Sequence, residues 1–210
     1  MKYLKWILAA ILAVVLVVGF YLDGCWVVIR RGDGGFARTV PEYEQAKRLE
    51  MVSTAKKWLG TQEGDADHEQ IIAIYNAHEP LAQGYPVTLT DNWCAAYASS
   101  IAIQCGMTDI VPTECGCERQ IGLWQNLGRW EEDDNYLPLP GDYIYYAWDD
   151  EREWGDCTGW ADHVGIVVGT SGPFIKVIEG NKDDQVTYRY ILRGYHQIRG
   201  YGLPNYAGIG

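Results

Sequence analysis

Hydrophobic positions in the first part of the chain recur with a helical spacing. Between Tyr43 and Leu59 the apolar residues fall on one stripe, and the glycine that follows, Gly60, is a common helix terminator. Thr39 and Glu42 have the spacing of a capping box just before this stripe. The same periodicity predicts further helices over residues 67–76, 92–106 and 118–127.

The pattern changes to that of β-strands after residue 140. Pro140, Gly141 and Asp142 form a turn signal, and short apolar runs separated by glycine, proline and charged residues follow it. These runs predict strands over residues 143–148, 163–168, 174–179 and 186–192. Helices followed by a meander of antiparallel strands indicate an α+β fold.

The N-terminus carries a separate signal. Residues 6–22 hold no formal charge and follow Lys2 and Lys5. This run is at the short end of the ~17–25 residues that span a bilayer, so we expect a transmembrane signal anchor over residues 1–29. A cleaved signal peptide is the alternative, and Cys25 stands in a partial lipoprotein box, where it would be lipidated. Residues 30–41 then read as a linker, and residues 42–210 as a single folded domain.

Composition and charge exclude several classes of protein. Hydrophobic residues make up 48% of the chain, which argues against disorder, and the formal net charge is −11. Nucleic acid and anionic lipid would repel so acidic a chain, so we expect no nucleic-acid partner. Nine Trp and fifteen Tyr supply amphipathic rings of the kind that bind sugars or peptides.

The strongest chemical signal is a cysteine at the predicted start of a helix, in Asn92-Trp93-Cys94-Ala95. If Asp91 caps this helix, Cys94 lies in its first turn, where backbone N–H groups and the helix dipole stabilise a thiolate. That position favours a nucleophile. A structural cysteine of the core is the alternative.

A histidine begins one of the predicted strands, at His163. If the next turn is centred on Ser171, the hairpin places Glu179 directly opposite His163 and Ile175 opposite Val167. Side chains directly opposite each other have Cβ atoms about 4.5–5.5 Å apart, which allows an imidazole–carboxylate hydrogen bond. The hairpin therefore predicts a base with an orienting group.

Two further residues share this predicted face. Asn181 follows Glu179 by two positions, and Gly165, beside His163, would leave room for the helix of Cys94 to pack closely. Nucleophile, base and orienting residue then follow the chain order Cys, His, Glu or Asn.

The chain resembles the CHAP domains, the cysteine, histidine-dependent amidohydrolases/peptidases related to NlpC-type cell-wall hydrolases, over about residues 88–206. The resemblance implies a papain-like α+β fold and hydrolysis of amide bonds in bacterial peptidoglycan. It assigns Cys94 as nucleophile and His163 as proton shuttle, with Glu179, Asn181 or both orienting the ring. Its motifs are Asn92-Trp93-Cys94-Ala95, Leu139-Pro140-Gly141-Asp142-Tyr143-Ile144, Asp162-His163-Val164-Gly165-Ile166-Val167 and Val177-Ile178-Glu179-Gly180-Asn181.

The other cysteines and acidic residues give weaker signals. Their spacing does not match the paired cysteines of a zinc site, and Asp65, Asp67 and Glu69 lack the glycine and terminal glutamate of an EF-hand, so we expect a helix cap there and no metal or other cofactor. An extracellular location favours two disulfides among four cysteines, with four reduced thiols as the alternative. These cysteines are Cys105, Cys115, Cys117 and Cys157.

Together these patterns predict an enzyme of the cell envelope. We expect a monomeric peptidoglycan hydrolase, either an N-acetylmuramoyl-L-alanine amidase or a stem-peptide or cross-bridge endopeptidase. Its N-terminal helix would hold it at the cell membrane with the domain outside, or it would be secreted if that segment is cleaved. A non-catalytic envelope protein that binds muropeptides or scaffolds a partner is one alternative, and a papain-like protease or acyltransferase is another.

Overall fold

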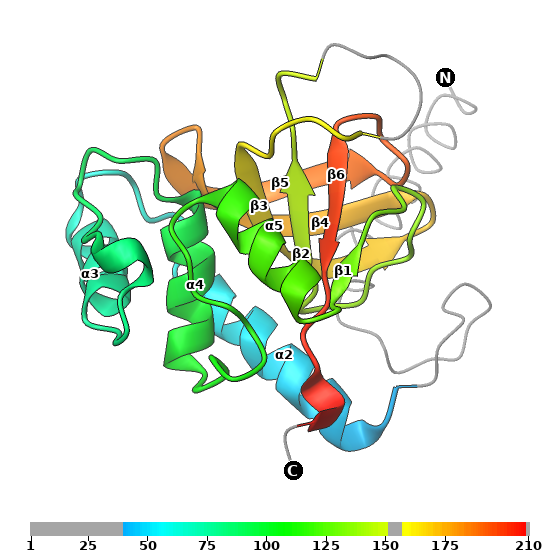
Figure 1. Cartoon of the computed structure of the whole chain (residues 1–210), viewed down its shortest axis with the longest axis horizontal. Coiled ribbons are helices and arrows are strands. Elements are labelled where there is room, and N and C mark those ends of the chain that lie inside the picture. The colour runs from blue at the N-terminus through cyan, green and yellow to red at the C-terminus, as the bar shows by residue number, and fades with distance from the viewer. Residues whose placement is uncertain (1–39, 151–156, 209–210) are drawn as a thin grey trace, which may run out of the picture.

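The computed structural model describes residues 40–150 and 157–208, whose arrangement is shown in Figure 1. The expected anchor at 1–29, Cys25 and all but the last two residues of the expected linker lie outside the described residues. Within the described part of the chain, no helix is both long enough and apolar enough to cross a bilayer.

Within the described residues, four α-helices precede or flank the sheet, as the periodicity predicts. Figure 1 shows α4 lying between α3 and the strands. Asp65 caps α3, because its Oδ1 accepts a hydrogen bond from the His68 backbone N–H at 2.7 Å. The expected capping box of α2 is wrong, since Pro41 is the residue at its N-cap and no side chain caps it. The helices are α2 (Glu42–Lys56), α3 (Ala66–Asn76), α4 (Cys94–Gln104) and α5 (Cys117–Asn126).

The buried face of α2 differs from the predicted stripe. Tyr43 is 55% exposed and Leu49 is also exposed, whereas Arg48 and Met51 are buried. The arginine occupies an inward position because acidic partners inside the molecule neutralise its charge.

In the part of the chain that the structure describes, six strands form one antiparallel sheet in the order β1-β6-β2-β3-β4-β5, which confirms the α+β class. The sequence pattern missed β1 and β6, and Figure 1 shows β6 beside β2 although most of the sheet separates them along the chain. The strands are β1 (Trp130–Glu131), β2 (Tyr143–Tyr146), β3 (His163–Ser171), β4 (Phe174–Lys182), β5 (Gln185–Leu192) and β6 (Ile198–Gly202).

Both faces of the sheet are buried. One apolar cluster lies between the helices and the sheet, and it includes Tyr97, Trp124 and Ile166. A second cluster covers the opposite face and includes Tyr146 and Val177. Alternate residues of each strand therefore enter different cores, so the face to which a residue points decides which groups it can meet.

The helix of Cys94 approaches the sheet at a glycine other than the expected one. A Cβ at Gly180 would lie 2.6 Å from the Cβ of Tyr97 in α4, so the absence of a side chain at Gly180 permits this packing. The expectation that Gly165 serves this purpose is wrong, because Val177 and Glu179 of β4 fill the space above it.

The register of the β3–β4 hairpin also differs from the expected one. Ser171 pairs with Phe174, and Val167 pairs with Val177 instead of the expected Ile175. A β-bulge between Val167 and Gly169 changes the register along the hairpin. The pairing of Ile166 with Ile178 places Glu179 across from Gly165, two positions away from its expected partner.

Candidate active site

Cys94 is the first residue of α4 and is 4% exposed. The expected cap, Asp91, lies outside the helix, and Trp93 holds the N-cap position, where its side chain does not cap the helix. The Asp91 carboxylate instead accepts hydrogen bonds from the backbone and hydroxyl of Thr88 and from Tyr85 Oη. The first-turn N–H groups of α4 are thus left without a side-chain cap, which suits stabilisation of an anion.

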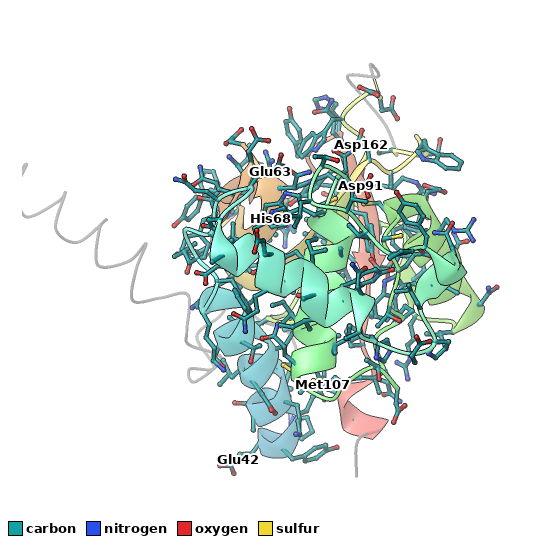
Figure 2. All side chains as sticks on the ribbon, turned by 90° about the vertical axis from the view of Figure 1, so that its left-hand side faces the viewer. Glu42, Glu63, His68, Asp91, Met107 and Asp162 are labelled. Carbon is teal, nitrogen blue, oxygen red and sulfur yellow. The ribbon has the colours of Figure 1, made fainter. Side chains whose placement is uncertain are left out.

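Trp93, the residue before Cys94, is held in place by residues that the sequence patterns did not mark. Its indole Nε1 donates to Glu63 Oε2 at 3.1 Å, and its ring lies 4.6 Å from the ring of His68. Figure 2 shows Glu63 and His68 close together at the N-terminal end of α3. These contacts bind α3 and the preceding loop to the residue before Cys94.

His163 opens β3 and lies at the same end of the molecule. Figure 2 shows Asp91 and Asp162 at the end of the molecule opposite Glu42. Asp91 is three residues before Cys94, and Asp162 is the residue before His163. The His163 ring is buried and stacks on Tyr146 with an interplanar angle of 24°.

The buried carboxylate of Glu179 holds the His163 ring. Glu179 Oε2 lies 3.0 Å from His163 Nε2, and the glutamate side chain is fully buried. The predicted contact is present, although it runs diagonally across the hairpin. The other ring nitrogen, Nδ1, is therefore left to hydrogen-bond the Cys94 sulfur.

A second charge acts on the same carboxylate. Arg189 Nε of β5 donates to both Glu179 oxygens, at 2.7 and 2.9 Å. Its guanidinium lies over the ring of Trp148, 4.5 Å from the centroid. The sequence patterns did not mark Arg189 as functional. It stands in the last predicted strand, at a position that looked exposed.

The electrostatics favour an ion pair between Cys94 and His163. Burial lowers the pKa of His163, but hydrogen bonds and charges from Cys94 and Glu179 outweigh it and raise the pKa to about 10. The hydrogen bond from Cys117 and the interactions with His163 together hold the pKa of Cys94 well below its ordinary value, against the opposing effect of burial. Burial raises the pKa of Glu179, yet His163 and Arg189 lower it overall. These opposite shifts favour a thiolate and an imidazolium as the resting state.

Asn181 lies close to these groups in sequence but contacts a different loop. Its Nδ2 donates to Asn92 Oδ1 at 3.4 Å. The residue has φ of 56°, and the pairing of β4 with β5 is irregular between Glu179 and Lys182. Asn181 thus joins the end of β4 to the loop that precedes Cys94, whereas Glu179 is the residue that contacts His163.

Cys117 is an unexpected neighbour of Cys94. Its Sγ lies 3.6 Å from Cys94 Sγ, and both residues are buried. The expected disulfides are absent, because Cys105, Cys115, Cys117 and Cys157 are all free thiols. Among the described residues, no group of three or more His, Cys, Asp or Glu side chains could hold a metal ion.

The comparisons with known proteins agree with this geometry. The family model of the CHAP domain matches residues 83–181, a segment that contains Cys94, His163, Glu179 and Asn181. No curated protein and no solved structure matches the chain. The match confirms the resemblance seen in the sequence motifs. Residues 83–181 of this chain therefore match the CHAP domain family, whose members are generally amidases and peptidases that act on the cell wall.

Proposed function

We propose that this protein is a peptidoglycan hydrolase that cleaves an amide bond with Cys94 as its nucleophile. The observation that carries the proposal is the line of contacts from the Cys94 sulfur to the His163 ring and from His163 Nε2 to the buried Glu179 carboxylate. A nucleophile beside a base that is oriented by a third group is the arrangement used in covalent acyl transfer.

The reaction follows from the resting ion pair. The Cys94 thiolate attacks the carbonyl carbon, and the oxyanion that forms accepts hydrogen bonds from first-turn N–H groups of α4. The His163 imidazolium gives its Nδ1 proton to the leaving amine, which breaks the C–N bond and leaves a thioester on Cys94. Neutral His163 then takes a proton from water, whose oxygen attacks the thioester and releases the acid.

Glu179 is the orienting residue in this proposal. Its carboxylate fixes the ring through Nε2 and stabilises the imidazolium, which a neutral amide does less well. Asn181 has a supporting role through Asn92, because it holds the loop from which the nucleophile helix begins.

The substrate is bacterial peptidoglycan, and the bond is either the N-acetylmuramoyl-L-alanine amide or an amide of the stem peptide or cross-bridge. The match to the CHAP family supports peptidoglycan as the substrate. The uncharged run at residues 6–22 supports a place at the outer face of the cell membrane, where the wall is within reach. We propose a monomer, anchored by its N-terminal helix or secreted after cleavage.

Digestion of purified sacculi by the full chain tests the activity and identifies the bond. We expect new fragments in the mass spectrum whose masses identify the cleaved amide. Cys94→Ala should reduce their release by at least about 10³-fold, because only the nucleophile is lost and alanine suits a helix.

Cys105→Ala is the matched control, since Cys105 lies just after the other end of α4 and should be dispensable. Fragment release above about a tenth of the wild-type rate by Cys94→Ala would refute the mechanism. Binding of intact sacculi with no cleavage by the wild-type chain would favour a non-catalytic envelope protein.

A further inference from the structure

The sulfur of the nucleophile has a second partner besides His163. Cys117 is the first residue of α5, and its Sγ lies 3.6 Å from Cys94 Sγ. This separation fits an S–H···S hydrogen bond and is far longer than the ~2.0 Å of a disulfide. Both side chains are almost fully buried, so water does not compete for the contact.

The surroundings of the two sulfurs decide which one keeps a proton. Two thiolates in contact in a buried site would repel each other, so the pair retains one proton. Cys94 faces the His163 imidazolium, whereas Cys117 lies within the field of the Asp162 carboxylate. The negative charge therefore resides on Cys94, and Cys117 is the donor.

We propose that Cys117 is a further catalytic residue, a thiol that donates a hydrogen bond to the Cys94 thiolate before attack and again when the thiolate leaves. The proposal rests on the proposed function in that Cys94 is the nucleophile. During attack, the Cys94 electron pair forms the S–C bond and the S–H···S hydrogen bond is given up. When the thioester is hydrolysed, the S–C bond breaks, the pair returns to Cys94, and Cys117 stabilises it there.

The proton of Cys117 is never transferred in this scheme, so no oxidant or further reactant is needed. The hydrogen bond lowers the energy of the free thiolate both as the resting nucleophile and as the leaving group. Its loss should therefore make Cys94 harder to ionise and slow the release of the acyl group.

The variants that test this role leave the other charged and titratable side chains around Cys94 and Cys117 unchanged. They are His163 and Asp162 at the start of β3, Glu179 of β4 with Arg189 of β5 behind it, and Tyr145 of β2.

The test is the pH dependence of Cys94 alkylation by iodoacetamide, followed in the full chain by mass spectrometry of the peptide that contains Cys94. From about pH 3 to about pH 9 the rate reports the thiolate fraction of Cys94. Cys117→Ala should raise the acidic midpoint by about one pH unit, a tenfold change in the ionisation equilibrium. Cys117→Ser keeps a donor of similar size and should restore most of the wild-type midpoint.

Cys115→Ala is the matched control, because Cys115 is two residues away and its sulfur lies near Glu114 and Gln83, not Cys94. It should leave the midpoint unchanged. An unchanged midpoint in Cys117→Ala would overturn the proposal. So would a Cys117→Ser midpoint displaced as far as that of Cys117→Ala, since the thiol would then act only through packing.

This readout needs no peptidoglycan and therefore separates the two proposals. If sacculi remain intact while the Cys117→Ala midpoint rises, the proposed substrate fails and the role of Cys117 stands. If sacculi are cleaved and the Cys117→Ala midpoint does not move, the proposed role of Cys117 is refuted and the proposed function stands.

Discussion

Four side chains of alternating charge run from the proposed nucleophile to the edge strand of the sheet. The Cys94 thiolate faces the His163 imidazolium, and Glu179 lies between His163 and Arg189. Each inner group has a neighbour of opposite sign, which offsets the cost of burying its charge. Replacement of one member should therefore shift the titration of the next.

Loss of the Glu179 charge should move the basic limb of the activity profile to lower pH. The pKa of His163 is raised to about 10 by Cys94 and Glu179 against the effect of burial, so the imidazolium persists up to that pH. Glu179→Gln removes one of the two raising partners, and the ion pair should then be lost at a lower pH. We expect a downward shift of at least about one pH unit and a rate loss of ~10²-fold near neutrality. The rate of fragment release from sacculi between about pH 7 and about pH 11 measures it, because release needs the His163 proton.

Arg189→Leu provides a contrast of opposite sign. It removes a positive charge near His163 and leaves the Glu179 carboxylate in place, so the basic limb should move upward. If the basic limb moved in the same direction in Glu179→Gln and Arg189→Leu, general distortion of the site, and not charge, would control its position. A silent Glu179→Gln together with a damaging Asn181→Ala would assign the orienting role to Asn181 instead.

The sequence reading reached most of this chain of groups because its signals are local. A cysteine at a helix start, a histidine at a strand start and a carboxylate in the next strand can each be read from a few neighbouring residues. Cys117 could not be found in this way. Its contact with Cys94 depends on how the first turns of α4 and α5 meet in space, which no spacing along the chain encodes.

At the level of elements, the β3–β4 hairpin explains why a wrong register still gave the right contact. The expected pairing placed Glu179 opposite His163, whereas the observed pairing places it opposite Gly165. The difference is two residues, and a strand repeats its facing every two residues, so Glu179 stays on the face of His163. A difference of one residue would have turned the carboxylate into the other core.

The diagonal contact depends on the missing side chain at Gly165. A Cβ there would lie 2.5 Å from Val177 Cγ1 and 2.7 Å from Glu179 Cγ. Gly165→Ala should displace Glu179 from His163, with a ~10²-fold slower alkylation of Cys94 at neutral pH and a destabilisation of about 1–3 kcal/mol. The alkylation rate and the urea midpoint measure the two effects.

Gly122→Ala is the control for this change, because Gly122 lies within α5 and a Cβ there would meet no atom within 4 Å. It should be neutral or stabilise the helix by roughly 0.5–1 kcal/mol. Wild-type alkylation in Gly165→Ala would show that Glu179 does not need this space.

The strands that escaped the sequence reading have a common physical reason. β1 has only two residues, and β6 is five residues long with two glycines and an arginine, so neither shows an alternating apolar pattern. They become strands by pairing, since β1 pairs with β6 and β6 pairs with β2. Strands that are stabilised mainly by distant partners carry little local signal.

At the scale of the whole molecule, the matched CHAP segment is only part of the folded unit. Residues 83–181 exclude α2 and α3 before α4 and β5 and β6 after the hairpin. Yet α2 supplies Met51 and Val52 to the main core, and β5 supplies Arg189 to the site. The flanking elements are thus expected to be required for both stability and catalysis.

A buried arginine fastens α2 to the turn before β2 and to the C-terminal end of the fold. Arg48 Nη1 donates to Asp142 Oδ1 at 2.7 Å and to the Pro140 carbonyl at 3.0 Å. Its guanidinium also lies 4.6 Å from the centre of the Tyr206 ring. These contacts join α2, which precedes the matched residues, and Tyr206, which follows them, to the turn at Asp142 within them.

Arg48→Leu should destabilise the protein by about 3–5 kcal/mol, because it leaves the fully buried Asp142 carboxylate without its cation. Chemical unfolding of the full chain, followed by tryptophan fluorescence, measures the change. The double variant Arg48→Leu/Asp142→Asn removes the uncompensated charge while an amide oxygen still accepts from the Leu139 N–H, so it should be more stable than Arg48→Leu alone. A loss below about 1 kcal/mol, or a double variant that is less stable than Arg48→Leu, would mean that the helix is held to the CHAP segment by apolar packing and not by this ion pair.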